Sequence, residues 1–169
     1  SLEKFGRIDI LINNAGIAIN RKPEDYSAEE WDRIINTNLK SVFLCSKAVY
    51  PFMKESGGGK IICIGSMYSI FGGLMTSIYG ASKGGVMQYM RGLAVSWARD
   101  NIQVNAILPG WIETDMVMGA VKAFPGFKES LEARTPMGRL GRPDDIAGAA
   151  IFLASKSSDF ITGVGVPVD

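Results

Sequence analysis

The chain alternates between short runs of apolar residues and longer stretches in which apolar residues recur every three or four positions. The run at residues 8–12 is almost entirely apolar, those at 60–65 and 102–107 are mostly apolar, and each is soon followed by Asn, Ser, Gly or Pro. Short apolar runs bounded by turn residues are typical of strands covered on both faces, as in a parallel sheet. A further short run at 164–168 predicts a last strand.

The stretches between these runs predict helices. Ser27 and Glu30 have the spacing of a capping box, which predicts a long helix over residues 27–55 that ends at the glycines 57–59. Apolar residues at helical spacing predict a second long helix over 77–98. Pro143, in the position of a first turn, predicts a third helix over 144–154.

Strands that alternate with helices predict an α/β fold with parallel strands and right-handed crossovers. In such folds, ligands bind beyond the carboxyl ends of the strands. Here those ends are residues 13–16, Ser66 and 109–114, so we expect three strand ends to meet at one crevice. Glycines 57–59 lack the Lys and the Ser or Thr of a phosphate-binding loop, and we interpret them as a turn.

Residues 115–135 show no clear period, and we expect them to be irregular. Their large apolar residues suit either ordinary core or a lid over a substrate. We favour a lid, because the segment follows a loop at the predicted crevice, and loops in such places often close over ligands. The residues concerned are Met116, Met118, Phe124 and Phe127.

The composition fits one soluble domain with its own core, since 47% of the 169 residues are hydrophobic and 21% are charged. A net charge of +1 gives no reason to expect nucleic acid or an anionic membrane as a partner. No apolar run is long enough to span a bilayer, and the first residues do not resemble a signal peptide. Cys45 and Cys63 are isolated, which predicts buried thiols in a reducing compartment and a cytoplasmic location.

The sequence contains no histidine, and this narrows the chemistry. A Ser-His-Asp triad and a His-ligated metal site are excluded, and we expect no metal. Acid–base chemistry near neutral pH must then use a Tyr, Lys, Cys or carboxylate whose pKa is shifted by its surroundings.

Tyr79 and Lys83 are a candidate for this chemistry, because residues four apart share one face of a helix. A phenol has an ordinary pKa of about 10. A neighbouring ammonium group and the positive end of a helix both favour the phenolate, so we expect a lowered pKa for Tyr79. Ser66, at the end of a predicted strand, would bind a substrate oxygen. Considered on their own, Tyr79 and Lys83 could also be a contact on the protein surface. Ser66 on its own could also be an ordinary loop residue.

The order of these residues resembles that of one protein family. Across its whole length the chain is similar to the classical short-chain dehydrogenases/reductases. The features that carry the resemblance are Asn13-Asn14-Ala15-Gly16, Thr37-Asn38-Leu39, Gly65-Ser66, the spacing of 13 between Ser66 and Tyr79, Tyr79-Gly80-Ala81-Ser82-Lys83, Val104-Asn105 and Pro109-Gly110-Trp111-Ile112-Glu113-Thr114. The resemblance implies a Rossmann-type fold, which is a doubly wound parallel sheet in three α/β/α layers.

The resemblance also implies catalytic roles. Tyr79 would be the acid/base, and Lys83 would lower its pKa and hold the nicotinamide ribose. Ser66 would bind the substrate oxygen, and Asn38 would kink its helix and hold a water of a proton relay. The residues that would bind the cofactor are Asn13, Asn14, Ala15, Gly16, Tyr79, Lys83, Pro109, Gly110, Ile112 and Thr114. Trp111 is bulkier than is typical at its position, and we expect it to shape the pocket.

Structural roles stay open for three of these residues. Asn13 and Asn14 would equally suit the end of a strand, because Asn is common in turns. Asn38 lies in the middle of a predicted helix, where it would equally form a hydrogen bond between helices.

The implied function is hydride transfer between NAD or NADP and a carbonyl or secondary alcohol, with a sugar acid, polyol or other small polar substrate favoured. A 3-oxoacyl-thioester reductase and a non-catalytic binding or regulatory member of the family are the alternatives. The two long helices and the last strand would form the interfaces of a homodimer or homotetramer.

By the same resemblance, residues 1–169 are the C-terminal portion of a single NAD(P)-binding domain. The Gly-x-x-x-Gly-x-Gly turn that receives a pyrophosphate is not in the sequence, and neither is the region that separates NAD from NADP. We expect the fold to be incomplete at its N-terminal side, with about 70–90 further residues before Ser1. We also expect this span alone to be inactive.

Overall fold

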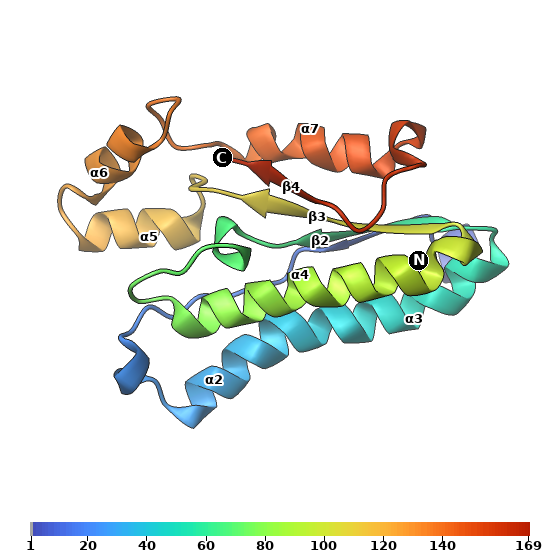
Figure 1. Cartoon of the computed structure of the whole chain (residues 1–169), viewed down its shortest axis with the longest axis horizontal. Coiled ribbons are helices and arrows are strands. Elements are labelled where there is room, and N and C mark those ends of the chain that lie inside the picture. Colours follow the sequence, from blue (N-terminus) through green and yellow to red (C-terminus); the bar gives the residue numbers. More distant parts are fainter. Residues whose placement is uncertain (1) are drawn as a thin grey trace.

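A computed structural model describes residues 2–169 and shows one sheet of four parallel strands (Figure 1). The strands lie in the order of the sequence. They are β1 (Ile10–Asn13), β2 (Gly59–Ile64), β3 (Ile102–Pro109) and β4 (Gly165–Val168). Each neighbouring pair is parallel, so the predicted parallel α/β architecture is confirmed.

Helices cover both faces of this sheet and give three layers (Figure 1). On one face lie α2 (Ala28–Ile35), α3 (Ser41–Glu55) and α4 (Ser77–Trp97), and on the other lies α7 (Pro143–Ala154). The remaining helices are α1 (Leu2–Phe5), α5 (Asp115–Ala123), α6 (Phe127–Arg134) and the short 3₁₀ helices η1 (Pro23–Asp25), η3 (Met67–Ser69), η4 (Ala98–Asp100) and η5 (Lys156–Ser158).

The capping box that the sequence predicts begins α2. The amide of Glu30 donates to the Ser27 hydroxyl at 3.2 Å, and the amide of Ser27 donates to the Glu30 carboxylate at 3.1 Å. Two amides that a helix start would leave unpaired are thereby satisfied.

The core has two parts because β2 sends alternate side chains to opposite faces. Ile61 and Cys63 join the cluster formed with α3 and α4, and Ile62 joins the cluster that contains Leu153 of α7. All four of these residues are at most 1% exposed. Complete burial of a side chain such as leucine stabilises a fold by roughly 1.5–3 kcal/mol, so both layers of helices are held firmly to the sheet.

The predicted helix over 27–55 is interrupted by a π-helical turn, η2 (Asn36–Lys40), between α2 and α3. Asn38 lies in this turn and is 1% exposed. Ser41, the first residue of α3, donates from its hydroxyl to the carbonyl of Thr37 in the turn at 2.5 Å. Single π-helical turns are frequent at functional sites, and this one gives Asn38 a position that a regular helix would not.

The expectation that residues 115–135 are irregular is wrong. They form α5 and α6, which meet at residues 124–126, where Gly126 has a positive φ of 79°. Within these helices only Leu131 is buried. Ala, Met, Lys and Glu have a high helix propensity of their own. Helices that bury so few side chains, however, show no regular spacing of apolar residues, and this spacing is the pattern from which the sequence analysis predicts helices.

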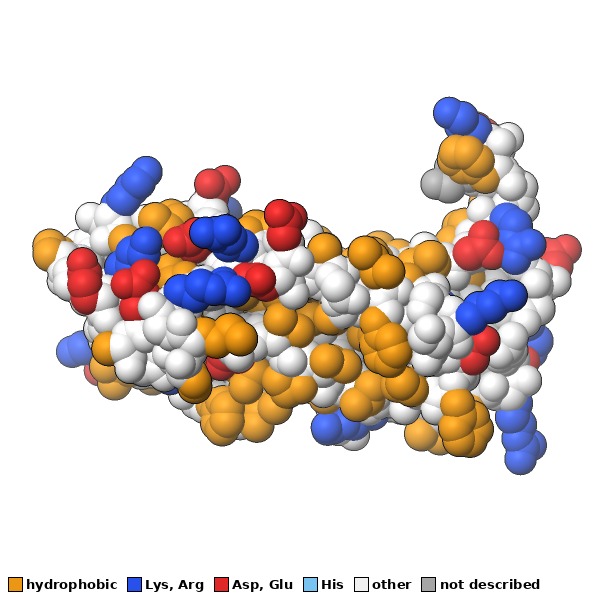
Figure 2. All heavy atoms as spheres, turned by 90° about the horizontal axis from the view of Figure 1, so that it is seen from above, with side chains coloured by type: hydrophobic (Ala, Val, Ile, Leu, Met, Phe, Trp, Pro, Cys, Tyr) orange, Lys and Arg blue, Asp and Glu red, His pale blue; other side chains and the backbone are white. Residues whose placement is uncertain are grey.

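Apolar side chains stay exposed on the outer face of α7. Ile151 is 69% exposed and Phe152 is 41% exposed. Figure 2 looks at the molecule from this side and shows a band of apolar side chains between charged groups at the two ends. Exposed apolar surface of this kind is typical of an interaction face.

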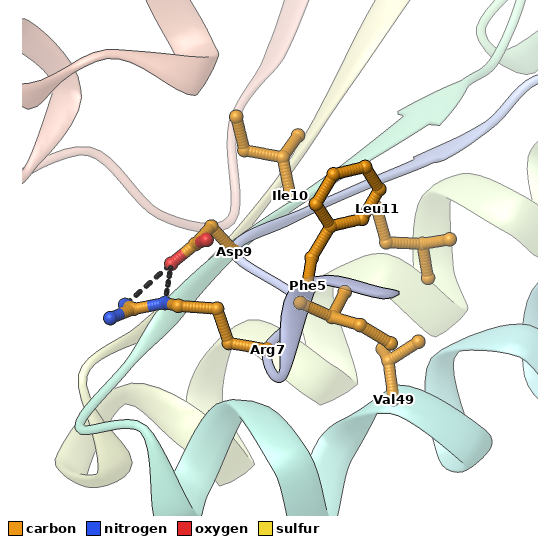
Figure 3. Close-up of a pocket in the computed structure, with 7 residues that line it drawn as sticks. Phe5, Arg7, Asp9, Ile10, Leu11 and Val49 are labelled. Atoms are coloured by element: carbon orange, nitrogen blue, oxygen red, sulfur yellow. Dashed lines mark hydrogen bonds and ion pairs between the residues drawn. The ribbon is translucent and has the colours of Figure 1, made fainter. Parts of the chain in front are cut away.

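Strand β1 is an edge of the sheet, and its apolar side chains are partly exposed. Ile10 and Ile12 are 45% and 48% exposed, and among the described residues β2 is the only strand that pairs with β1. A hollow of about 560 Å³ lies beside the start of this strand (Figure 3). It is lined by Phe5, Arg7, Ile8, Asp9, Ile10, Leu11 and Val49, none of which is a predicted site residue.

Candidate active site

A second cavity, of about 430 Å³, lies at the carboxyl ends of the strands. The three strand ends that the sequence analysis expected to converge do meet here. The lining residues are Asn14, Gly16, Ile64, Gly65, Ser66, Tyr79, Lys83, Pro109, Gly110, Ile112, Thr114, Met116, Val117, Pro143 and Ile146. The cavity therefore brings together three of the four predicted catalytic residues and most of the predicted cofactor-binding residues.

Helix α4 places Tyr79 and Lys83 on this cavity from its first two turns. The Lys83 ammonium nitrogen lies 5.8 Å from the centre of the Tyr79 ring. Lys83 is only 4% exposed, and its Nζ donates to the carbonyl of Ile64 at 2.7 Å. An ammonium group has three donors, so Lys83 is anchored by one bond and retains donors for a ligand.

Burial dominates the titration of both residues. It lowers the pKa of Lys83 to about 8. It also raises the pKa of Tyr79 above that of an ordinary phenol, while the nearby Ser66 hydroxyl acts to lower it and Tyr68 acts to raise it further. The direction for Tyr79 differs from the one expected from sequence, because desolvation outweighs the other influences. The phenol is therefore protonated at neutral pH and is suited to donate a proton.

Ser66 caps the short helix η3 and is held by its neighbours. Its hydroxyl oxygen accepts from the amide of Tyr68 at 3.2 Å, and its own amide donates to the Ser69 hydroxyl at 3.2 Å. The Ser69 hydroxyl in turn donates to the carbonyl of Lys83 at 2.9 Å. Because the Ser66 oxygen accepts an amide proton, its own hydrogen is directed elsewhere and can be donated to a bound oxygen.

Asn38 does not line the cavity. Its hydrogen bonds join the loop after β1 to α4, and both of these elements contribute residues to the cavity. Its Oδ1 accepts from the amide of Ile17 at 2.8 Å, and its Nδ2 donates to the carbonyl of Ile17 at 2.9 Å. The same Nδ2 donates to the Ser82 hydroxyl at 3.0 Å, and that hydroxyl donates to the carbonyl of Tyr79 at 2.7 Å. The bond to Ser82 is a hydrogen bond between helices, the structural role that the sequence left open. Ser82 was missed, although it lies inside the Tyr79–Lys83 motif.

The loop after β1 approaches the site closely at Gly16. A Cβ atom placed there would lie 3.3 Å from Lys83 Nζ and 3.6 Å from Asn38 Oδ1. Asn14 also lines the cavity, whereas Ala15 is exposed and does not. Glycine therefore permits the contact between this loop and α4.

Asn13 belongs to the core and not to the cavity wall. Its side-chain nitrogen donates to the Ser46 hydroxyl at 3.2 Å and to the Cys63 sulfur at 3.7 Å. Successive side chains of a strand point to opposite faces, and at this position the side chain turns toward α3. These contacts favour the structural alternative, a polar group that is satisfied inside the protein, and the cofactor role of Asn13 stays a prediction.

The opposite wall of the cavity comes from the end of β3 and from α5 and α7. Gly110 is fixed to the last strand, since its amide donates to the carbonyl of Val168 at 3.0 Å. Sequence reasoning suggested Pro109 as part of the cofactor site and Met116 as part of a lid, but it missed Val117, Pro143 and Ile146. Pro143 and Ile146 lie in the first turns of α7 and are separated from the motif by more than 25 residues, so only the fold brings them here.

The two cysteines differ from the expectation that both are buried. Cys45 is exposed, and Cys63 is buried. Burial raises the pKa of the Cys63 thiol to about 11, which rules it out as a base near neutral pH. Among residues 2–169, no helix is long and apolar enough to cross a membrane.

Comparisons with known proteins agree with the resemblance in the motifs. A family model described as Enoyl-(Acyl carrier protein) reductase matches residues 1–169. The 2-dehydro-3-deoxy-D-gluconate 5-dehydrogenase of Dickeya dadantii is 44% identical over 170 residues, which cover 100% of this chain and 67% of the relative. The 3-oxoacyl-(acyl-carrier-protein) reductase of Thermotoga maritima is 38% identical over 172 residues, which cover 99% of this chain and 67% of the relative.

Among solved structures, a gluconate 5-dehydrogenase from Burkholderia cenocepacia in complex with NADP and tartrate matches with a TM-score of 0.95 at 39% identity. The match covers 99% of this chain and 66% of that one. The chain thus spans about two thirds of the length of the proteins that it matches, and the solved structure shares its fold almost throughout this span.

Proposed function

This chain belongs to the short-chain dehydrogenase/reductase family, and on that premise we propose that the protein is an oxidoreductase that transfers a hydride between NAD(P) and a carbonyl or secondary alcohol. The observation that carries the proposal is the convergence of Ser66, Tyr79 and Lys83 on one cavity at the carboxyl ends of the strands. Ligands of open parallel sheets bind at such a place.

Proton transfer is assigned to Tyr79. In the direction of reduction, its hydroxyl donates a proton to the carbonyl oxygen while the carbonyl carbon gains a hydride and becomes an alcohol. The Ser66 hydroxyl donates a hydrogen bond to the same oxygen and holds it beside the phenol. The Lys83 ammonium lies near the ring and stabilises the tyrosinate that remains, because an opposite charge favours the ionised form.

The residues around the cavity suit the nicotinamide end of a dinucleotide. Lys83 retains donors for ribose hydroxyls, and Thr114 offers a hydroxyl on the opposite wall. The loop comes close to Lys83 at Gly16, which has no side chain to stand between them. When bound there, NAD(P) supplies or accepts the hydride. Asn14, Gly16, Pro109, Gly110 and Ile112 complete the proposed binding wall.

Asn13 and Ala15 are left out of this wall. Asn38 is proposed to support catalysis from outside the cavity, because its bonds to Ile17 and Ser82 hold the β1 loop against α4. The π-helical turn that contains Asn38 gives it this reach.

A keto sugar acid or its alcohol is the favoured substrate. The support is the similarity to gluconate dehydrogenases, together with a small cavity that offers several hydroxyl and amide groups. A 3-oxoacyl thioester is the second candidate, and the similarity to the reductase of Thermotoga maritima favours it. A non-catalytic role is disfavoured, because Ser66, Tyr79 and Lys83 line one cavity and Asn38 is joined through Ser82 to the carbonyl of Tyr79.

We further propose that residues 1–169 are the C-terminal portion of one NAD(P)-binding domain. The exposed apolar residues of β1 and the hollow beside it support this, since an apolar edge is normally covered by further chain (Figure 3). The complete protein would thereby gain the strands and the phosphate-binding turn that the relatives' greater length provides room for.

Assembly into a homodimer or homotetramer is part of the proposal. Phe43 and Leu44 of α3 and Val95 of α4 are 40%, 51% and 83% exposed, and the face of α7 adds a second apolar surface (Figure 2). Val49, Tyr89 and Trp97 of the same two helices pack partly buried against the core. A cytoplasmic location is proposed because both cysteines are free thiols.

The test uses the complete protein, assayed with a keto sugar acid and with a 3-oxoacyl thioester, each with NADH and with NADPH. Tyr79→Phe keeps the ring but removes the proton, and we expect kcat to fall by roughly 10²-fold or more. Tyr89→Phe, on the same helix but away from the cavity, is the matched control and should leave kcat unchanged. Near-wild-type turnover by Tyr79→Phe would reject the proposed function.

A further inference from the structure

Ser69 does not line the cavity, yet its hydroxyl is bonded to two residues that do. The hydroxyl oxygen accepts from the amide of Ser66 at 3.2 Å, and the hydroxyl donates to the carbonyl of Lys83 at 2.9 Å. Ser66 follows β2 and Lys83 lies in α4. A single side chain therefore connects the end of this strand to the helix that carries Tyr79.

The short helix η3, which contains Ser69, packs closely on α4. A Cβ atom at Gly80 would lie 3.5 Å from the carbonyl oxygen of Tyr68, and one at Gly84 would lie 3.9 Å from the carbonyl oxygen of Ser69. These two glycines are four residues apart and therefore share one face of α4. A side chain longer than a methyl group at either position would meet the backbone of η3, so the two glycines allow the approach that Ser69 then fixes.

The bond from Ser69 to Lys83 adds to the hydrogen bonds of the helix and does not replace one of them. A carbonyl inside a helix accepts from the amide four residues later and still has a second lone pair. The Ser69 oxygen is also confined from the other side, since a Cβ atom at Gly65 would lie 3.0 Å from it. The bond therefore holds η3 on α4 and is not needed to complete the helix.

We propose that Ser69 is a positioning residue that fixes the distance between the Ser66 hydroxyl and the Tyr79 phenol, the two groups that must share one substrate oxygen. The inference rests on the proposed function. Tyr79 lies one turn before Lys83, so a link from Ser66 to the backbone of Lys83 also fixes Ser66 relative to the phenol. Misplacement of a reacting group by about 1 Å can cost roughly 10²-fold in rate, so loss of the link should be visible in kcat.

The ionisation of Tyr79 gives this role a signature. Burial raises the pKa of Tyr79, and the nearby Ser66 hydroxyl acts in the opposite direction. When Ser66 is no longer held in place, the opposing effect weakens and the pKa of Tyr79 rises further. Among the described residues, the other titratable groups that face Tyr79 are Tyr68 of η3 and Lys83 of α4, and both side chains remain when Ser69 is changed.

The test compares Ser69→Ala with the wild type in the complete protein, assayed with the proposed substrate that it reduces and with the corresponding alcohol. Ser69→Ala should lower kcat roughly tenfold or more, while KM for NAD(P) changes by less than about twofold. Alcohol oxidation needs the ionised phenol, so the pH at which its rate climbs should move upward in the variant.

Ser158→Ala is the matched control. Ser158 is fully buried, and its hydroxyl donates to the carbonyls of Leu153 and Ser155, away from the cavity. Its loss should lower stability but leave kcat and the pH profile unchanged.

An unchanged kcat in a folded Ser69→Ala variant would overturn the inference and leave the proposed function intact. A lower kcat with an unshifted pH profile would overturn it as well, because a merely structural defect does not change how Tyr79 ionises. If Ser69→Ala does not fold, Ser69→Cys places a weaker donor of similar shape at the same position. The same two changes are then expected, and the absence of either one would overturn the inference.

A further readout does not depend on turnover. The tyrosinate absorbance of the complete protein, minus that of the same protein with Tyr79→Phe, follows the ionisation of Tyr79 alone. In Ser69→Ala this titration should lie at higher pH than in the wild type. If the wild-type protein turns over no substrate, the proposed function fails, and an unchanged titration would then also reject the positioning role of Ser69.

Discussion

Strands β1 and β3 are built from the same kind of residues but have very different surroundings. Seven of the eight residues of β3 are buried, and they carry the core between two layers of helices. In β1 only Asn13 is buried, and Ile10 and Ile12 are almost half exposed. Yet both strands pair in parallel within one sheet.

The difference shows that an apolar sequence alone does not make a strand buried; the surrounding elements must cover it. β3 lies between β2 and β4, whereas β1 has a neighbour on one side only. The proposed active site depends on the ends of β2 and β3 and on α4, and it touches β1 only through the loop that follows that strand. The side chains proposed to react are therefore together in one cavity, whereas strand β1, on the side where we expect the rest of the cofactor site, is partly exposed.

The strongest test of this contrast compares residues 1–169 with the complete protein. We expect the isolated span to be poorly soluble and to show neither turnover nor measurable NADH binding, because its apolar edge is unpaired and no phosphate-binding turn is present. Titration with NADH by fluorescence measures the binding. A soluble monomer with micromolar affinity for NADH would show that the edge needs no cover.

A second test compares one residue of each strand in the complete protein. Ile107→Ala in β3 should cost about 2–5 kcal/mol of unfolding free energy, as is usual for a large-to-small change in a core. If β1 is covered in the complete protein, Ile10→Ala should cost a similar amount. Chemical denaturation measures both values. A cost below about 0.5 kcal/mol for Ile10→Ala, typical of a surface position, would mean that this edge remains exposed.

A third test removes the hydrogen bonds by which Ser82 joins Asn38 to the carbonyl of Tyr79. Ser82→Ala removes the acceptor of the buried Asn38 amide, and we expect a loss of roughly 1–3 kcal/mol of stability. It also removes the bond to the carbonyl of Tyr79, so kcat should fall while KM changes little. Ser46→Ala, which removes the partner of Asn13 in the core, is the control and should lower stability alone. Equal kcat values for the two variants would contradict a positioning role for Ser82.

A fourth test concerns pH. Burial holds the pKa of Lys83 at about 8 in the folded protein, below its ordinary value of 10.5. The unfolded chain therefore binds more protons between these two pH values, and stability gains a contribution from Lys83 as the pH rises through this window. Lys83→Met lacks that contribution, so its melting temperature should gain less than that of the wild type between pH 8 and 10. Parallel curves for the two proteins would show that Lys83 titrates normally.

Local patterns were sufficient for much of the fold. The capping box at Ser27, the two long helices and the parallel strands follow from short-range spacing, because the periods of helices and strands differ and each element buries one or two faces. The same holds for Tyr79 and Lys83, which share a helix face through their spacing of four. Helices α5 and α6 were missed, because they bury too little to show a period.

The sequence by itself determined the four strands, the long helices that pack on the sheet, and which side chains share a face of α4. Only the tertiary structure decided that Asn13 turns into the core, that Ser82 ties Asn38 to Tyr79, and that Pro143 reaches the cavity. It also decided that β1 is exposed while β3 is buried. The physical reason is that spacing along the chain fixes the face on which a side chain lies, whereas the partner on that face comes from segments far away in the sequence.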